Sequence, residues 1–558
     1  MRKQKTKRSM MGISLLAVMG ITLLTPGAGI NEVNATSSPS DAGIEENAAS
    51  SPSDAGIEEN AASSPSDVEM MNAAPTAPVA INSTAFPDDV FREWVSVHCD
   101  KDSDGFLSDA ERSQCTYIIV EEMGITSLTG IELFPNLTRL ECDDNNLSSL
   151  DVSNNTALTY LYCQKNHLSS LNVSNNTALE NLACNINNIS SLDVSNNTAL
   201  SHLSCSGNNL SSLDVSSNTA LTELFCDYNN ISSLDVSNNT ALMILFCTHN
   251  NLSNLDVSNN IALKVLVCPH NNLSSLDVSN NTALKDLTCY NNNISNLDIS
   301  KNTALTELNC RANDLSSLDV SYNTALTRLD CSWNNISSLD VSYNTALAHL
   351  TCYNNNISQL NVSKTQNLEE LYYNNNALCS LDLSKNTKLQ KLISNTQIIS
   401  VPMYKNGNKY YIDLSVLPLD LKKVSIDEAS GKTDGATYDN TSGQINLSES
   451  KDVGDTVRYL YETNGPALDN TKMTVTLKIS EVRDITEPTT EQPTTEQPAT
   501  EQPSTSQPVK VEPAPTQNDN SKDPSPKTGD TAPLYPVIFL LLASFVGGMT
   551  LYIGKKQK

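Results

Sequence analysis

The sequence predicts a mainly β protein whose central part is a parallel β-solenoid with one coil every 21 residues. Three observations support this: cysteines recur every 21 residues, leucines hold fixed places around each one, and an asparagine stands three residues after it. A fixed period of this length is typical of repeat proteins, in which each coil packs only against its neighbours. The cysteine column consists of Cys142, Cys163, Cys184, Cys205, Cys226, Cys247, Cys268, Cys289, Cys310, Cys331 and Cys352, and Tyr373 continues it.

The coil around Cys226 shows why the repeat predicts a strand followed by a turn. Leu224 and Cys226 alternate as the inward residues of a strand do, and the amide of Asn229 can bond the backbone of the turn that follows. A 21-residue coil leaves no room for a helix on its outer side, so we expect an extended or turned segment there. The order of leucines, Cys226 and Asn229 resembles the leucine-rich repeat over about 118–393, and the resemblance implies a leucine-rich repeat solenoid. The apolar set of this coil is Leu221, Leu224, Cys226, Ile231, Leu234 and Val236.

The column cysteines are expected to be free, buried thiols of low reactivity. Neighbouring strands lie ~4.8 Å apart, whereas a disulfide needs Cβ atoms about 3.5–4.5 Å apart and turned toward each other. A zinc site is not expected, because the sequence contains no Cys-x-x-Cys pair. Cys99 and Cys115 lie outside the column, and whether they pair stays open.

The N-terminus predicts a secreted protein. Residues 1–35 combine a basic head, a short apolar run and a small-residue cleavage site at Val33-Asn34-Ala35, as in a signal peptide. Residues 36–80 contain two copies of SSPSDAGIEENAA with almost no large apolar residue, so we expect a disordered linker.

Residues 81–117 predict an N-terminal cap that closes the first coil and carries a cation loop. A helix is expected from the spacing of Phe86, Val90, Phe91, Trp94 and Val97, and Val120 takes the cysteine position of the first coil. The stretch DKDSDGFLSDAE resembles an EF-hand, because it offers oxygen ligands at every position that calcium uses in such a loop. The resemblance implies one Ca²⁺ bound by Asp100, Asp102, Asp104, the Phe106 carbonyl, Ser108 and Glu111.

Beyond the solenoid, which we place at 118–397, the chain predicts a second module and a spacer. Residues 398–483 contain alternating strand patterns separated by turn residues, which indicate a small β-sandwich, an immunoglobulin-like one being an option. Residues 484–524 are rich in Pro, Thr, Glu and Gln, and within them 489–508 repeat TTEQP with period five, so the regular prolines favour an extended linker that could span a cell wall.

Residues 525–558 predict an anchor. The stretch SPKTG is followed by an apolar segment at 534–554 and a basic tail, and 534–554 is long enough to be a transmembrane segment. This order resembles the sortase sorting signal of Gram-positive surface proteins and implies that sortase cuts between Thr528 and Gly529 and joins Thr528 to peptidoglycan. The motif begins with Ser525 where Leu is commonest, so the class of sortase stays open.

A binding face is predicted on the concave side of the solenoid. Residues that alternate with the buried strand residues must face outward, and several of them in adjacent coils are large and apolar, which usually marks a contact surface. His249 and His270 neighbour this set, and we expect them to be exposed polar side chains. The predicted binding residues are Phe225, Phe246, Val267, Ile244, Val265, Tyr228 and Trp333.

Together these features predict a monomeric, non-enzymatic surface protein. The net charge of −28 argues against nucleic acid as a partner, and no catalytic constellation or phosphate loop recurs. The combination of repeats, a β module and a wall anchor resembles internalin-type adhesins, which implies a cell-wall-anchored protein that binds a protein ligand on host or neighbouring cells. A glycan- or mucin-binding protein and a purely structural wall spacer are the alternatives. Aliphatic Ile244, Val265 and Val267 favour protein over glycan.

The anchor makes a testable prediction. Replacing Thr528 with Ala removes the residue that the resemblance places in the bond to the wall, so the protein should appear in the medium or stay in the membrane. Fractionation of cells followed by immunoblotting measures this, and unchanged attachment to the wall would refute the assignment.

Overall fold

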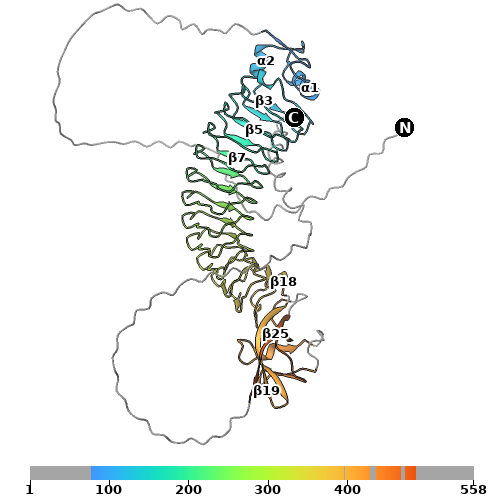
Figure 1. Ribbon diagram of the computed structural model, residues 1–558, viewed down its shortest axis with the longest axis vertical. Helices are drawn as coiled ribbons and strands as arrows, with labels where there is room; N and C mark the ends of the chain where they lie inside the picture. The colour runs from blue at the N-terminus through green and yellow to red at the C-terminus, as the bar shows by residue number, and fades with distance from the viewer. Residues whose placement is uncertain (1–76, 395, 428–434, 467–471, 486–558) are drawn as a thin grey trace, which may run out of the picture.

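The computed structural model describes residues 77–394, 396–427, 435–466 and 472–485, and its main feature is a curved stack of coils. The stack runs from a helical cap to a C-terminal β module (Figure 1). Each coil contributes one short strand to a 14-stranded parallel sheet in which neighbours pair in register, so that Leu224 lies opposite Leu245. The strands are β3 (Tyr117–Ile119), β4 (Arg139–Glu141), β5 (Tyr160–Tyr162), β6 (Asn181–Ala183), β7 (His202–Ser204), β8 (Glu223–Phe225), β9 (Ile244–Phe246), β10 (Val265–Val267), β11 (Asp286–Thr288), β12 (Glu307–Asn309), β13 (Arg328–Asp330), β15 (His349–Thr351), β17 (Glu370–Tyr372) and β18 (Lys391–Ile393).

The repeat pattern places its apolar residues in one continuous core, as predicted. Leu224 and Cys226 are fully buried, as are Val120 and Tyr373 at the two ends of the column. On the other side of the coils, β14 (Leu339–Asp340) and β16 (Leu360–Asn361) form a short parallel pair. Between residues 118 and 394 the helical content that the structure describes is one 3-10 turn, η1 (Ile131–Leu133). The predicted β-solenoid without outer helices is therefore confirmed.

The asparagine that follows each strand forms the predicted ladder. The Asn229 amide donates to the carbonyl of Cys226 in its own coil (3.2 Å) and to that of Cys205 in the preceding coil (3.1 Å). Its Oδ1 accepts a hydrogen bond from the backbone N–H of Leu210 (3.0 Å). Gln397 takes the same position after the last coil, donating to the Tyr373 carbonyl (3.0 Å). The ladder thus satisfies buried backbone groups that a strand and turn would leave unpaired.

A second asparagine ladder lies on the other side of the core. The second Asn of the turn SNNT is fully buried in most coils; in the coil of Cys226 it is Asn239. Its amide donates to the carbonyls of Val215 (2.9 Å) and Asn218 (2.8 Å) in the preceding coil, while its Oδ1 has no partner among the described residues. Sequence reasoning treated this segment only as a polar turn, although the strict recurrence of the second Asn was a signal for a structural role.

The column cysteines are free and fully buried, as expected. The Cys226 thiol donates to the Phe246 carbonyl of the next coil at 3.5 Å. Burial raises the pKa of Cys184, Cys289 and Cys352 to about 12. These thiols therefore act as small core side chains.

The N-terminal cap contains two short helices, α1 (Asp89–His98) and α2 (Asp109–Gln114), on either side of the predicted cation loop. The predicted helix is present, but its predicted apolar face is wrong in part, because Val90 and Val97 are 38% and 67% exposed. Phe86 is buried but precedes the helix. The apolar face consists instead of Phe91, Trp94 and Val95.

Asp88 joins this cap to the first coil. As the N-cap of α1 it accepts hydrogen bonds from the backbone N–H groups of Val90 and Phe91, and it also accepts bonds from the backbone and hydroxyl of Thr126 (both 2.8 Å). Upstream, β1 (Val79–Ala80) pairs antiparallel with β2 (Phe106–Leu107) of the loop. The predicted linker over 36–80 is therefore wrong for Val79 and Ala80.

The C-terminal module is one mixed seven-stranded sheet, which does not confirm the predicted β-sandwich. The long strand β19 (Gln397–Asn406) bulges at Val401/Pro402 and pairs with β25 (Lys472–Asp484) on one side and with β20 (Lys409–Asp413) on the other. The edge strands β21 (Val424–Ile426) and β22 (Thr437–Asp439) lie in contact, so the sheet curls on itself. An immunoglobulin-like arrangement stays a prediction. The module contains β19 (Gln397–Asn406), β20 (Lys409–Asp413), η2 (Leu421–Lys423), β21 (Val424–Ile426), β22 (Thr437–Asp439), β23 (Gln444–Leu447), β24 (Thr456–Glu462) and β25 (Lys472–Asp484).

Several predicted segments lie outside the described residues: the signal peptide, most of the N-terminal linker, nearly all of the TTEQP spacer, and the sorting signal with its apolar segment 534–554. Among the residues that the structure describes, no helix has the length and apolar character needed to cross a bilayer.

The second ladder predicts an asymmetric effect of two neighbouring substitutions. Asn239→Ala removes hydrogen bonds to two buried carbonyls, so we expect a loss of about 2 kcal/mol in the free energy of unfolding. The adjacent Asn238 is exposed, and among the described residues its amide donates only to the Ser216 carbonyl (3.2 Å). Asn238→Ala should therefore cost less than about 0.5 kcal/mol. Equal denaturation midpoints for the two variants would contradict a structural role of the second ladder.

Candidate functional site

The apolar part of the predicted binding face lies on strands β8 to β10. Each strand buries its central leucine and turns its two flanking side chains away from the core. In-register pairing places Ile244 beside Val265 and Phe246 beside both Phe225 and Val267. We call these five residues the apolar patch. All five are half-buried, because they pack against one another; the Phe225 and Phe246 rings meet edge to face with centroids 5.1 Å apart.

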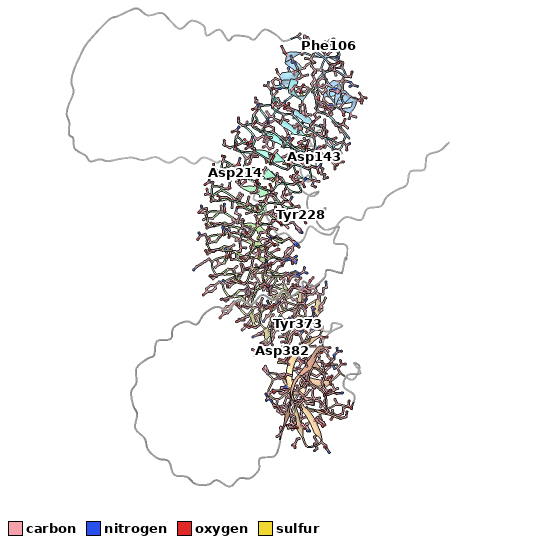
Figure 2. All side chains as sticks on the ribbon, viewed as in Figure 1. Phe106, Asp143, Asp214, Tyr228, Tyr373 and Asp382 are labelled. Atoms are coloured by element: carbon pink, nitrogen blue, oxygen red, sulfur yellow. The ribbon has the colours of Figure 1, made fainter. Side chains whose placement is uncertain are left out.

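A stack of aromatic rings runs beside the apolar patch, on the turn after each strand. The Tyr228 ring stacks on His249 at a centroid distance of 4.3 Å, and His249 stacks on His270 at 3.9 Å. Tyr290 meets the far side of His270 edge-on at 5.2 Å. Tyr228 and Asp143 lie on the inner side of the curve, opposite Asp214 (Figure 2). The expectation of freely exposed histidines is corrected, since both are half-buried in this stack.

Trp333 is not part of this arrangement. It occupies the same turn position as His270 but three coils farther along, beyond Asn291 and Ala312, or about 14 Å at ~4.8 Å per strand. Its side chain is 53% exposed. The structure thus brings together six of the seven predicted binding residues and leaves Trp333 apart.

The stacked rings sit on a backbone conformation that disfavours them. Tyr228, His249 and His270 have φ values of 52°, 51° and 53°, in the left-handed region. Glycine or asparagine adopts this conformation more readily, and other coils use Gly207 or Asn291 at the same position. A non-glycine residue in this conformation costs on the order of 1 kcal/mol. Three consecutive aromatic rings at such a position indicate that their side chains serve packing or binding.

Carboxylates border the apolar patch at both ends. Glu223 bonds the Nδ1 of His202 at 3.0 Å, and the His202 ring packs against Phe225 at 5.4 Å. At the other end, Asp286 lies opposite Glu307 in the register. Burial, together with the charge of Glu307, raises the pKa of Asp286 to about 6. The patch therefore presents an apolar centre with anionic edges.

The predicted cation loop brings three carboxylates together. One oxygen each of Asp100, Asp102 and Asp104 lies within 4.8 Å of the others. Desolvation raises the pKa of Asp102, and the charges of Asp104, Glu111 and Asp100 also raise it. These like charges fit a cation, which would relieve their repulsion.

Glu111 closes the loop through the backbone and the N-cap of α2. Its Oε1 accepts from the Lys101 N–H (2.7 Å), and its Oε2 accepts from the backbone and hydroxyl of Ser108 (both 2.8 Å). Burial opposes ionisation of Glu111, but these hydrogen bonds hold its pKa below the usual value. Gly105 makes the sharp turn with φ of 83°.

Comparison with solved structures reveals the family. The functional domain of InlJ from Listeria monocytogenes, which includes a cysteine ladder, is 30% identical with a TM-score of 0.55, covering 73% of this chain and 99% of that domain. The chain belongs to the leucine-rich repeat proteins. An internalin, InlF of Listeria monocytogenes, is 25% identical over 58% of this chain and 92% of its own, with a TM-score of 0.47. A leucine-rich repeat protein of Leptospira interrogans is 22% identical over 52% and 87%, also at 0.47. No family model and no curated protein matches the chain.

Sequence reasoning missed several residues at this leucine-rich repeat face. His202 and Asp286 occupy the same column as Ile244, one coil before Glu223 and one coil after Val265 respectively, and Tyr290 immediately precedes the turn position of Asn291. Large apolar side chains predict a contact surface, and neither His202 nor Asp286 is of that kind. Reading the outward columns for charge as well as size would have found the first two.

The histidine stack makes a prediction about protonation. Burial, followed by the charge of His270, lowers the pKa of His249 to about 4, and burial also lowers the pKa of His270. Histidine ring signals followed by NMR should show His249 titrating near pH 4. In His270→Asn, which keeps a residue suited to the left-handed turn, the pKa of His249 should rise. A value near 6.5 in the unaltered chain would contradict the stack.

The sign of the effect on stability follows from the same pKa. Because the folded value lies below the unfolded value of 6.5, the unfolded chain takes up the proton first as the pH falls. The stack therefore loses stability between about pH 6.5 and pH 4, whereas it is unaffected above that window.

Proposed function

We propose that this leucine-rich repeat protein is a non-enzymatic, cell-wall-anchored surface protein that binds a protein ligand through the apolar patch and the adjoining aromatic stack. The observation that carries the proposal is the joint presence of the five apolar side chains on adjacent strands and of the rings of Tyr228, His249 and His270 on the neighbouring turns. The likeness to InlJ supports a binding role. The SPKTG motif and its apolar segment support attachment to peptidoglycan by sortase through Thr528.

The charge around the patch indicates which ligand it fits. Glu223 stands at one end of the patch, and Asp286 and Glu307 stand at the other. A protein segment with apolar side chains at its centre and Lys or Arg at its ends would bury the patch and pair these carboxylates. Stacking rings also suit sugars, so a glycan array tests the alternative of a glycan or mucin ligand. A chain that binds neither class would be the structural spacer.

The central test is the substitution Phe246→Ser. Phe246 lies between Phe225 and Val267 in the register and packs edge to face on Phe225, and a few central residues usually dominate the affinity of an interface. The Kd of whichever protein a cell-surface pull-down captures should rise at least tenfold, or about 1.4 kcal/mol. Because the ring is half-buried, the substitution should also cost about 1 kcal/mol of stability.

A matched control separates binding from folding. Val453 is 64% exposed on the C-terminal module, so Val453→Ser should change neither affinity nor stability. If Phe246→Ser binds as tightly as the unaltered chain, the binding site lies elsewhere.

We also propose that the loop of Asp100, Asp102, Asp104, Phe106, Ser108 and Glu111 binds one calcium ion that stabilises the cap. The three converging carboxylates and the repulsion among them support it. Calcium prefers such oxygen ligands, and at a concentration 100 times its Kd it would add about 2.7 kcal/mol to the stability of the folded state.

Asp102→Asn tests the calcium site in two directions. Without calcium the variant should be slightly more stable than the unaltered chain, because one of the repelling charges is gone. With calcium it should lose most of the increase in melting temperature that the unaltered chain gains. Glu93→Gln, an exposed position on α1, is the control and should leave that increase intact. Identical melting curves with calcium and with a chelator would contradict the proposal.

A further inference from the structure

Two cysteines outside the solenoid column face each other in the N-terminal cap. The Sγ atoms of Cys99 and Cys115 lie 2.8 Å apart. Cys99 ends α1, where its N–H donates to the Val95 carbonyl at 2.8 Å, and Cys115 ends α2, where its N–H donates to the Glu111 carbonyl at 3.1 Å. Both sulfurs are thus fixed by the ends of helices and need to approach by only about 0.8 Å to reach the ~2.0 Å of a disulfide bond.

This pair differs from the column cysteines in access to solvent. Every column thiol is fully buried, whereas Cys115 is only half-buried and Cys99 is 1% exposed. A partly open cavity is lined by both cysteines and by Trp94, His98 and Tyr117. A small thiol reagent can therefore reach Cys115, but not Cys226 or its stacked neighbours.

We propose that Cys99 and Cys115 form a disulfide that clamps the two ends of the segment 100–114, which contains the whole cation loop. The oxidant is a small-molecule disulfide of the glutathione type. The more accessible Cys115 thiol loses its proton and attacks that disulfide, which releases one thiol and leaves a mixed disulfide on Cys115. Cys99 then loses its proton and displaces the second thiol. The Sγ–Sγ bond forms, the two protons and two electrons end on the two released thiols, and no other reagent is needed.

The clamp restricts the unfolded cap more than the folded one. In the folded protein the two Sγ atoms are already 2.8 Å apart, so forming the bond requires little movement of the backbone. In the unfolded cap it would tie together two positions that are otherwise free to separate, which favours the folded state. The disulfide can form whether or not the loop binds calcium. It will persist only in an oxidising environment such as the cell exterior, so this inference rests on the secretion that the signal peptide predicts.

Oxidation of the purified native chain tests the disulfide directly. The protein is reduced with dithiothreitol, freed of reductant and incubated with oxidised glutathione, and its peptides are then mapped without reduction. We expect one cross-link, between Cys99 and Cys115, and unmodified thiols throughout the column. Cys379→Ser changes a buried cysteine outside both groups and should retain the cross-link. A native protein in which Cys99 and Cys115 stay unlinked, while the denatured chain cross-links, would overturn the proposal.

Limited trypsin digestion then tests the clamp. Lys101 and Arg112 are the cleavage sites inside the segment. We expect cleavage there to be at least tenfold slower in the oxidised protein than in the reduced protein, at equal calcium. A variant carrying Cys99→Ser and Cys115→Ser should be cleaved at the same rate before and after oxidation. If the disulfide forms but oxidised and reduced proteins are cleaved equally fast, the bond does not clamp the loop.

Discussion

The hydrogen-bonding of a very short coil is the constraint on which this structure depends. A coil of 21 residues has three residues of strand and no helix, and backbone bonds to the neighbouring coils leave several buried groups, such as the Cys205 carbonyl and the Leu210 N–H, without a backbone partner among the described residues. Asparagine amides provide the missing partners. Asn229 and its equivalents satisfy the backbone on the strand side, and Asn239 and its equivalents do so on the opposite side. Each asparagine bonds the preceding coil, so the same contacts that complete one coil also stack it on its neighbour.

The ladders also fix where side chains can serve binding. The residue before each strand-side asparagine is held in the left-handed conformation, and the turn is locked by backbone bonds to the next coil, such as Tyr228 N–H to the Thr248 carbonyl at 2.8 Å. Side chains at this position therefore repeat at strand spacing and can stack, as Tyr228, His249 and His270 do. Cys226 fits the same scheme, because a small side chain fills the core beside Asn229 without pushing the coils apart. The asparagine ladder therefore fixes the backbone of this turn in every coil, while the side chain at the position of Tyr228 can differ from coil to coil.

Sequence periodicity was enough to predict the solenoid, because each position in a repeat is sampled many times. The burial of Leu224 and Cys226 and the bonds of Asn229 followed from their columns. The role of Asn239 was also open to prediction, since its position is Asn in nearly every coil, whereas the position of Asn238 holds Ser217, Lys301 or Tyr322 in other coils. Single-copy segments were harder. The face of α1 was misassigned at Val90 and Val97 because a ten-residue helix samples the helical period too few times. The single curled sheet depends on how β19 pairs, which alternation along one strand does not reveal. At the candidate site, the patch followed from alternation, whereas the ring stack depends on a left-handed backbone angle that Gly207 and Asn291 indicate in other coils but Tyr228 and His249 do not.

Site-resolved hydrogen exchange of the native protein tests the ladders most directly. In each coil one backbone N–H donates to the Oδ1 of the next coil's asparagine, for example Leu210 to Asn229 and Ile231 to Asn250 at 3.0 Å. If the ladders hold the stack together, these amides should be among the slowest to exchange, with similar protection in every interior coil. Exchange at the rate of an unstructured peptide would mean that the asparagines merely accompany the fold and do not hold it.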